Sequence, residues 1–254
     1  MTNTFRTCSM LLAALALTAC ASGPGPRSTR TVIDRALAGV PPAAQPSEVV
    51  AREIAFGQAA RERGQYTAAL DFAAGDAMLH GRNGPVLARP VFSQLDNPET
   101  AAQWSPRTVM MSCDGRLAVS RGRFLDPEGM IGTYVTVWER DSFEDDYDWS
   151  YDVAALDDPQ PVAEEAEESL IVVTASDDIQ GLVADCPRGG STPAPAPALD
   201  PAGDASRGVT LSRDGTLRWV WEHRPDGTKY VRADYYTSGA WETVIEEALV
   251  SSPE

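Results

Sequence analysis

The stretch RTVMMSCDGRLAVSRGRF, residues Arg107–Phe124, determines the fold class that the sequence predicts. Its residues follow a period of two on both sides of Asp114-Gly115, a pair typical of a hairpin turn. The next stretch, MIGTYVTVWE over Met130–Glu139, is rich in the β-branched and aromatic residues that suit a pleated sheet. With Tyr147–Val153 as a further strand, these segments predict an antiparallel meander of about four strands.

On the N-terminal side, helical patterns precede the meander. Apolar residues recur at helical spacing after Ser47, which we expect to cap a helix that ends at Gly64. Glu53 falls inside the apolar stripe of that helix and makes it imperfect. We expect a second short helix to begin at Thr67 and to end at Gly75. A strand at Asp76–His80, a turn at Asn83-Gly84 and a helix at Asn97–Trp104 complete this part of the prediction.

On the C-terminal side, low-complexity sequence gives way to strands. Asp157–Glu168 is acidic and is expected to be solvated, and Leu170–Thr174 is apolar enough for a buried strand. Arg188–Gly208 is rich in Pro, Ala and Gly and predicts a disordered loop. Two hairpin signals, Asp214-Gly215 and Asp226-Gly227, separate three expected strands at 209–212, 217–223 and 230–236. Residues 240–249 fit a strand or a helix, and 209–250 either extends the main sheet or forms a separate hairpin unit.

The order of these elements resembles the nuclear-transport-factor-2-like superfamily, also called the cystatin-like or SnoaL/ketosteroid-isomerase-like fold. The residues that carry the resemblance are EIAFGQAARERGQYTAALDFAAGDAMLH (Glu53–His80) and Arg107–Asp141. Within that superfamily the segment, roughly residues 48–153, is similar to uncharacterised bacterial exported proteins. The resemblance rests on the order of elements and includes no diagnostic catalytic motif.

The resemblance implies an α+β fold in which N-terminal helices pack on a curved antiparallel sheet and form a cone with an open pocket. To this the sequence adds a β-rich C-terminal extension. Some members of the superfamily are isomerases, dehydratases or hydrolases that use carboxylates, Tyr or His in the pocket, whereas others only bind or dimerise. His80 is the one histidine in the matched region, so a dehydratase-like histidine pair is not available there. Fold alone therefore does not fix the function.

Residues 1–19 are expected to be a lipoprotein signal peptide. Met10–Ala19 (MLLAALALTA) is uncharged but shorter than the roughly 20 apolar residues that a bilayer span needs, so it fits a secretory signal. It ends in Leu17-Thr18-Ala19-Cys20, which resembles a bacterial lipobox and predicts Cys20 as a lipidated N-terminus. An ordinary signal with a coincidental cysteine is the alternative. Ala21 and Ser22 follow, which for such lipoproteins implies the outer membrane, on its periplasmic face, rather than the inner membrane.

The chain has four cysteines, and their expected fates differ. Cys8 leaves with the signal and Cys20 receives lipid, so two cysteines remain in an oxidising compartment. We expect Cys113 and Cys186 to form a disulfide, with two free buried thiols as the alternative. Two cysteines without a CxxC motif do not suggest a metal site.

The charge of the chain excludes some partners. Its 21 basic and 37 acidic residues give a formal net charge of −16, and loss of Arg6 with the signal makes it −17. This acidity argues against a nucleic-acid partner. We expect no metal and no cofactor, because G-x-S-x-G, HExxH and phosphate-loop motifs are missing from the sequence. Much of the negative charge lies in 141–152 and 157–168, which we interpret as solvated surface.

Two groups of residues are candidates for a site. Asp76 and His80 lie four apart on one expected strand, so they share a face and form an acid–base pair near neutral pH. A structural histidine at a strand end is the alternative. The second group alternates along two strands and would line an apolar pocket or, alternatively, pack in the core. Its members are Tyr134, Thr136, Trp138, Trp149 and Tyr151.

The sequence thus predicts a lipid-anchored envelope protein whose non-catalytic domain binds a small apolar ligand or a protein partner. A pocket enzyme of the isomerase, dehydratase or hydrolase type is the alternative. The predicted partners are the membrane, through lipid on Cys20, an envelope protein, and a second copy bound through the sheet. The predicted organisation is a signal at 1–19, a flexible tether at 20–46, the cone-fold domain at 47–156, an acidic and Pro/Ala-rich loop region with one strand at 157–208, and the extension at 209–250.

Overall fold

The computed structural model describes residues 44–161, 179–187, 192–200 and 203–250. All of them belong to one compact unit of the chain. The predicted signal peptide, Cys20, most of the tether and the expected strand at 170–174 lie outside the described residues. No helix in the described ranges has the length and apolar character needed to cross a membrane.

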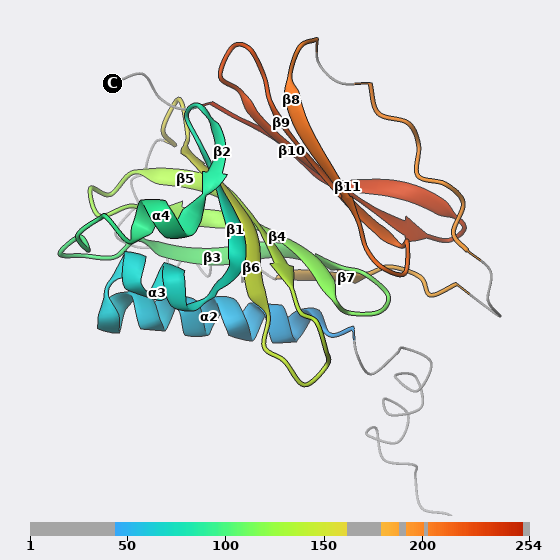
Figure 1. Ribbon diagram of the computed structural model, residues 1–254, viewed down its shortest axis with the longest axis horizontal. Coiled ribbons are helices and arrows are strands. Elements are labelled where there is room, and N and C mark those ends of the chain that lie inside the picture. Colours follow the sequence, from blue (N-terminus) through green and yellow to red (C-terminus); the bar gives the residue numbers. More distant parts are fainter. Residues whose placement is uncertain (1–43, 162–178, 188–191, 201–202, 251–254) are drawn as a thin grey trace, which may run out of the picture. The chain divides into compact units, whose positions relative to one another are not determined.

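The described chain is a mixed α+β structure with two sheets (Figure 1). Its helices are α2 (Pro46–Arg63), α3 (Gln65–Asp71) and α4 (Ala88–Phe92). The strands of the first sheet are β1 (Ala73–Gly81), β2 (Gly84–Leu87), β3 (Gln103–Met111), β4 (Leu117–Leu125), β5 (Ile131–Glu139), β6 (Asp148–Leu156) and β7 (Gln180–Val183). The strands of the second sheet are β8 (Ser206–Leu211), β9 (Leu217–His223), β10 (Lys229–Thr237) and β11 (Ala240–Leu249).

The first sheet contains the predicted meander. Its strand order is β2-β1-β6-β5-β4-β3-β7, and β3 to β6 are antiparallel neighbours, as the alternating pattern and turn signals predicted. β1 pairs in parallel with β6, and the short β7, which the sequence did not predict, pairs in parallel with β3. Tertiary pairing therefore adds strands at both edges of the meander.

The sequence left open whether residues 240–249 form a strand or a helix and whether 209–250 extends the main sheet, and the second sheet decides both. Residues 240–249 form a strand, β11, rather than a helix. The order β11-β10-β9-β8 is that of a separate antiparallel sheet, so the extension does not add strands to the first sheet. The expected loop before it has no regular structure at 192–200, but it is not a free loop there. The indole of Trp241 donates a hydrogen bond to Ala194 O (2.7 Å), and Arg218 donates one to Pro197 O.

Two apolar cores lie on the two faces of the first sheet. Strand β5 contributes side chains to both cores, because successive side chains of a strand point to opposite faces. Trp138 packs with α2, α3 and α4 in the first core, whereas Val135 and Val137 pack against the second sheet. In Figure 1, α2 and α3 lie along one face of the first sheet and β9, β10 and β11 lie beyond the other. Strand β5 is therefore buried on both faces, like the central strand of a layered structure.

The helix ends differ from the expectation. Pro46 takes the first position of α2, and Gln45 rather than Ser47 precedes the helix. Gly64 ends α2 at a φ of 99°, as predicted. Thr67 does not cap α3, because the Asn97 side chain accepts hydrogen bonds from the backbone N–H groups of Tyr66 (2.7 Å) and Thr67 (3.2 Å).

This use of Asn97 also explains a wrong prediction. The segment 97–104 is not a helix, and its last two residues begin β3. A helix starting there would need the Asn97 side chain for its own first turn. The side chain instead satisfies the amides of α3, which is distant in sequence.

Two similar hairpin turns meet where the sheets adjoin. In each turn a serine hydroxyl donates to an aspartate two residues later, Ser112 to Asp114 (2.7 Å) and Ser212 to Asp214 (2.6 Å). The second aspartate also accepts a hydrogen bond from Asp114 N (2.7 Å). The predicted disulfide between Cys113 and Cys186 is present next to these turns, with the Cα atoms 5.1 Å apart.

Candidate functional site

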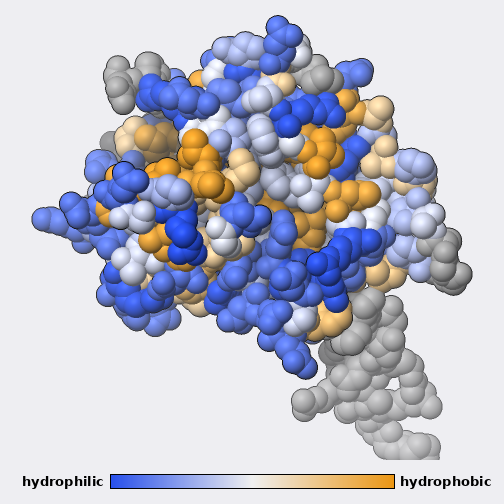
Figure 2. Space-filling view, in the orientation of Figure 1, coloured by the Kyte–Doolittle hydropathy of each residue, from blue (hydrophilic) through white to orange (hydrophobic). Residues whose placement is uncertain are grey.

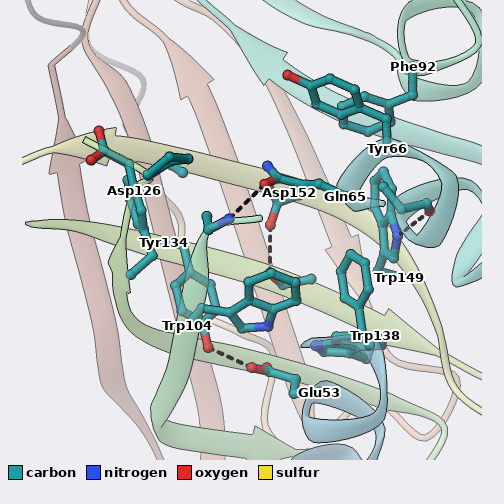
Figure 3. Close-up of a pocket in the computed structure, with 17 residues that line it drawn as sticks. Glu53, Gln65, Tyr66, Phe92, Trp104, Asp126, Tyr134, Trp138, Trp149 and Asp152 are labelled. Atoms are coloured by element: carbon teal, nitrogen blue, oxygen red, sulfur yellow. Dashed lines mark hydrogen bonds between the residues drawn. The ribbon is translucent and has the colours of Figure 1, made fainter. Parts of the chain in front are cut away.

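A cavity of about 260 Å³ lies between the helices and the first sheet. Most of its wall is aromatic and aliphatic, and a few polar groups reach it (Figure 3). The polar and acidic side chains in the wall are Glu53, Gln65, Asp126, Thr136 and Asp152. The aromatic side chains in the wall are Phe56, Tyr66, Phe92, Trp104, Phe124, Tyr134, Trp138 and Trp149.

The aromatic wall is held by ring contacts between helices and strands. Phe56 on α2 packs edge-on against Trp104 on β3, with ring centroids 4.8 Å apart. Tyr66 on α3 stacks on Phe92 on α4 at 5.4 Å, and Phe92 packs against Trp149 at 6.3 Å. Such pairs stabilise the arrangement of the rings around the cavity.

Four of the five pocket residues predicted from the sequence line this cavity: Tyr134, Thr136, Trp138 and Trp149. Tyr151, the fifth, lies on the other face, in the core between the sheets. The reason is an irregularity in β6. Trp149 pairs with Trp138 but Tyr151 pairs with Val137, so Ser150 is an extra residue that reverses the alternation.

Glu53 is the most buried acidic group of the pocket, with 2% of the residue exposed. Its Oε2 accepts a hydrogen bond from the Tyr134 hydroxyl at 2.5 Å, and its Oε1 has no partner among the described residues. Burial raises the pKa of Glu53 to about 7, and the nearby polar groups of Ser120, Tyr134 and Trp138 offset only part of this effect. Glu53 can therefore hold or release a proton near neutral pH.

Asp152 on β6 supplies the second carboxyl group. Its Oδ1 accepts a hydrogen bond from the Thr136 hydroxyl at 2.6 Å (Figure 3). Burial raises the pKa of Asp152 to about 6, whereas the Thr136 hydrogen bond and the positive charge of Lys229 act in the opposite direction. The pocket thus contains two carboxyl groups whose pKa values lie above their ordinary values.

Sequence reasoning missed both carboxyl groups as functional residues. Glu53 was interpreted as a defect of the apolar stripe, although a carboxylate within such a stripe is itself the signal of a buried acid. Asp152 belongs to the acidic stretch 141–152 that the sequence predicts to be solvated surface, but the residue is only partly exposed. Its position in β6, opposite Thr136 of β5, places it in the pocket wall.

The predicted pair of Asp76 and His80 does not form. Asp76 is exposed and lines a separate polar hollow, whereas His80 is buried, with 2% exposed. The pairing of β1 with β6 is irregular between Ala73 and Met78, so the even spacing does not keep both side chains on one face.

His80 has a structural setting at the junction of the two sheets. Its Nδ1 lies 2.5 Å from the hydroxyl of Tyr151, and its Nε2 lies 3.2 Å from Nδ1 of His223 on β9. Burial, then the neighbouring His223 and Lys229, lowers the pKa of His80 to about 4. The imidazole is therefore neutral at physiological pH and joins the sheets by hydrogen bonds.

The polar hollow that Asp76 lines has a volume of about 450 Å³ and several acidic side chains. Arg52 on α2 pairs with two of them, Asp146 and Asp148, both at 3.2 Å. Within the described part of the chain, no three His, Cys, Asp or Glu side chains are grouped so that they could hold a metal ion. The aromatic pocket is therefore the candidate functional site.

The surface offers less than the pocket. Exposed apolar side chains occur on β2, at Val86 and Leu87, and on β8, at Val209 and Leu211. Figure 2 shows apolar patches on the face in view that are interrupted by hydrophilic side chains.

Comparisons with family models, with curated proteins and with solved structures find no match for this chain.

Proposed function

We propose that the chain is a lipid-anchored protein of the bacterial envelope whose aromatic pocket binds a small, largely apolar ligand. The pocket carries this proposal, because formed concave sites with apolar walls and a few convergent polar groups are typical of ligand binding. The volume of about 260 Å³ is just below the roughly 300 Å³ at which small-molecule pockets commonly begin. A ligand of one or two rings fits these dimensions.

The wall and the polar groups have different roles in this proposal. The rings of Phe56, Trp104 and Trp149 supply contact area, and burial of apolar surface contributes about 25 cal/mol per Å². Glu53 and Asp152 orient the ligand, because each offers a carboxyl group in otherwise apolar surroundings. Ligand binding is favoured over a protein partner because the apolar patches on the face in Figure 2 are interrupted by polar side chains, whereas most of the cavity wall is aromatic and aliphatic.

The nuclear-transport-factor-2-like superfamily is the family that we propose. The order α2, α3, β1, α4 and then the meander β3 to β6 supports it, as does a pocket between helices and sheet. We propose a cone-shaped arrangement for this part of the chain. The second sheet packs against the face of the first sheet that is opposite the pocket, so the predicted homodimer would need another surface.

The envelope location rests on the lipobox-like residues that end in Cys20. We expect the full chain to incorporate labelled palmitate in a bacterial host and to sediment with the membrane fraction. Cys20→Ser should abolish both properties, whereas Cys8→Ser should retain them because residue 8 leaves with the signal. Unchanged labelling of Cys20→Ser would contradict the anchor.

Native mass spectrometry of the full chain, extracted from the bacterial envelope, tests the binding proposal. We expect a co-purifying small molecule on the wild type. Ala154→Phe places a ring in the pocket wall and should remove the adduct. Ala248→Phe, the same exchange at an exposed position of β11, should leave it. An adduct that persists in Ala154→Phe would place the ligand elsewhere, and the lack of any adduct on the wild type would count against the proposal.

A pocket enzyme is the second candidate function, and the two carboxyl groups favour it. Efficient general acids and bases have pKa values near the working pH, and those of Glu53 and Asp152 are about 7 and about 6. Such a pair could move a proton between two atoms of a bound ligand. Deuterium exchange next to the carbonyl group of small cyclic ketones tests this candidate. Exchange should be faster with the wild type than with Glu53→Gln, and no acceleration would contradict it.

A further inference from the structure

We infer that the ligand of the aromatic pocket is a small organic cation, an amine in its ammonium form or a quaternary ammonium compound. This inference rests on the proposed function and specifies its ligand class. Three observations support it: the sign of the charges in the wall, an unpartnered buried oxygen, and the tryptophan rings in the wall.

The ionisable side chains in the pocket wall, apart from the Tyr66 and Tyr134 phenols, are all acidic. Glu53, Asp126 and Asp152 line the cavity, and none of the described residues in its wall is Lys, Arg or His. Basic groups lie nearby but outside the wall. Lys229 on β10 donates a hydrogen bond to Ala154 O at 2.7 Å. Burial raises the pKa of Tyr134, and Arg107 on β3 is close enough to offset part of that rise. The wall therefore has the charge pattern that attracts a cation.

The unpartnered oxygen of Glu53 shows where the cation would bind. Its Oε1 is buried and has no hydrogen-bond partner among the described residues, whereas its Oε2 is held by Tyr134. A buried carboxylate oxygen without a partner is costly, and an N–H donor or a positive charge beside it removes that cost. The carboxyl group is thus held by Tyr134, and its second oxygen is buried beside the polar groups of Ser120 and Trp138 without a hydrogen bond of its own to any described residue.

The tryptophan rings in the wall suit the same ligand. Trp104, Trp138 and Trp149 line the cavity together with both carboxyl groups. Tryptophan is the side chain whose ring face attracts cations most strongly, and sites for quaternary ammonium groups are commonly built from such rings. The chain already uses this interaction outside the pocket, where the guanidinium group of Arg52 lies 4.1 Å from the ring centroid of Phe72.

Cation binding should depend on pH, because the ammonium group favours the ionised carboxylates. The groups that act on the pKa of Glu53 are Ser120 on β4, Tyr134 and Trp138 on β5, and Asp152 on β6. Those that act on the pKa of Asp152 are Thr136 on β5 and Lys229 on β10. Since the two pKa values are about 7 and about 6, affinity for a cation should rise between pH 5 and pH 8 and then level off.

Calorimetric titration of the full chain with two matched ligand pairs tests the inference. Choline and 3,3-dimethylbutan-1-ol have the same shape and differ in charge, and benzylammonium and benzyl alcohol extend the comparison to a ring. We expect the cation of at least one pair to bind at least tenfold more tightly than its neutral partner at pH 8. The preference should shrink at pH 5.5.

Isosteric variants assign the effect to the two carboxyl groups. Glu53→Gln and Asp152→Asn should each weaken cation binding about tenfold and change the binding of the neutral partner less than twofold. Retained binding of the neutral partner shows that the pocket is intact. Asp204→Asn, which removes the charge of an exposed aspartate that precedes β8 of the second sheet and lies outside the pocket wall, should have no effect.

Two results would overturn the inference. If the neutral partners bind as tightly as the cations or more tightly, the pocket takes a neutral ligand, and the binding proposal stands without the cation. If neither cation binds, the inference is also wrong. Native mass spectrometry of the wild type and Ala154→Phe then decides separately whether the pocket is a ligand site at all.

Discussion

At the scale of single residues, Glu53 decides the chemistry of the pocket. Its carboxyl group lies in the apolar stripe of α2, where helix periodicity directs the side chain inward, and Tyr134 is its hydrogen-bond partner. The next residue, Ile54, is apolar but 62% exposed. The helix is therefore rotated so that an acid, rather than an isoleucine, faces the sheet.

The first prediction concerns the pH dependence of stability. The pKa of Glu53 is about 7 in the folded chain and near its ordinary value of 4.5 when unfolded, so the folded state binds the proton more tightly. Stability from this group is present below pH 4.5 and is lost as the pH rises through 7, by roughly 3 kcal/mol. Glu53→Gln should remove this loss. Urea unfolding between pH 5 and pH 8 measures how the free energy of unfolding falls with pH in the wild type and in Glu53→Gln, with Asp96→Asn as the control.

If the wild type and Glu53→Gln lose stability in parallel over this range, the buried carboxyl group is not the cause. Asp152, whose pKa is about 6, adds a smaller loss that ends at lower pH, so the wild-type stability should fall more steeply below pH 6 than between pH 6 and pH 7.

At the scale of elements, close packing between neighbouring strands of the meander keeps Tyr134 in its position in the pocket wall. Gly122 on β4 lies against Tyr134, and a Cβ atom there would be 2.6 Å from the tyrosine ring and too close to Ser105 O. Gly122→Ala should therefore destabilise the chain by about 1–3 kcal/mol and displace Tyr134 from Glu53. Gly75→Ala, with no atom within 4 Å of its Cβ position, is the matched control. Equal unfolding midpoints for the two variants would contradict this packing.

A second element-scale prediction concerns the disulfide. Cys113 and Cys186 are 73 residues apart, and closing a loop of this length restricts the unfolded chain by about 4 kcal/mol. The double variant Cys113→Ser, Cys186→Ser should lose roughly 2–4 kcal/mol in denaturant unfolding. Reduction of the wild type should give the same unfolding midpoint as the double variant. If neither change lowers the midpoint, the disulfide does not contribute to stability.

The elements that the sequence predicted correctly are those specified by local chemistry. β3 to β6 follow from alternation and from turns such as Asp114-Gly115. α4 and β7 are five and four residues long, and tertiary contacts rather than propensity stabilise elements of this length. The pocket residues on β5 were predicted because the strand is regular, whereas Tyr151 was misplaced because the extra residue in β6 depends on its pairing partners.

At the scale of the whole described unit, the second sheet covers the first. Alternation in β9 and β10 predicts that one face of each strand is buried, but it does not say what covers that face. The structure supplies the partner, since side chains of both sheets share one apolar core. Arg121 on β4 also pairs with Glu247 on β11. The apolar stripe indicates that Glu53 is buried, but its pairing with Asp152 in one pocket could not be predicted, because the two residues come from elements that only the fold brings together.

The shared core predicts that the two sheets unfold together. Leu217 on β9 is fully buried in that core, so Leu217→Ala should cost about 2–5 kcal/mol. Hydrogen exchange should show the same loss of protection for the amides of β5 as for those of β10. Val209→Ala, at an exposed position of β8, should change protection by less than about 0.5 kcal/mol. Loss confined to the second sheet would mean that the sheets are independent.

The six tryptophans permit the most direct test of the proposed binding site. Three of them, Trp104, Trp138 and Trp149, line the pocket, and the other three, Trp219, Trp221 and Trp241, lie in the second sheet. The measurement is the set of indole N–H resonances of the full chain during titration with small ring compounds, charged and neutral. We expect bound compounds to shift the resonances of the three pocket tryptophans and to leave the other three in place. Shifts confined to the second sheet, or no shift with any compound, would contradict it.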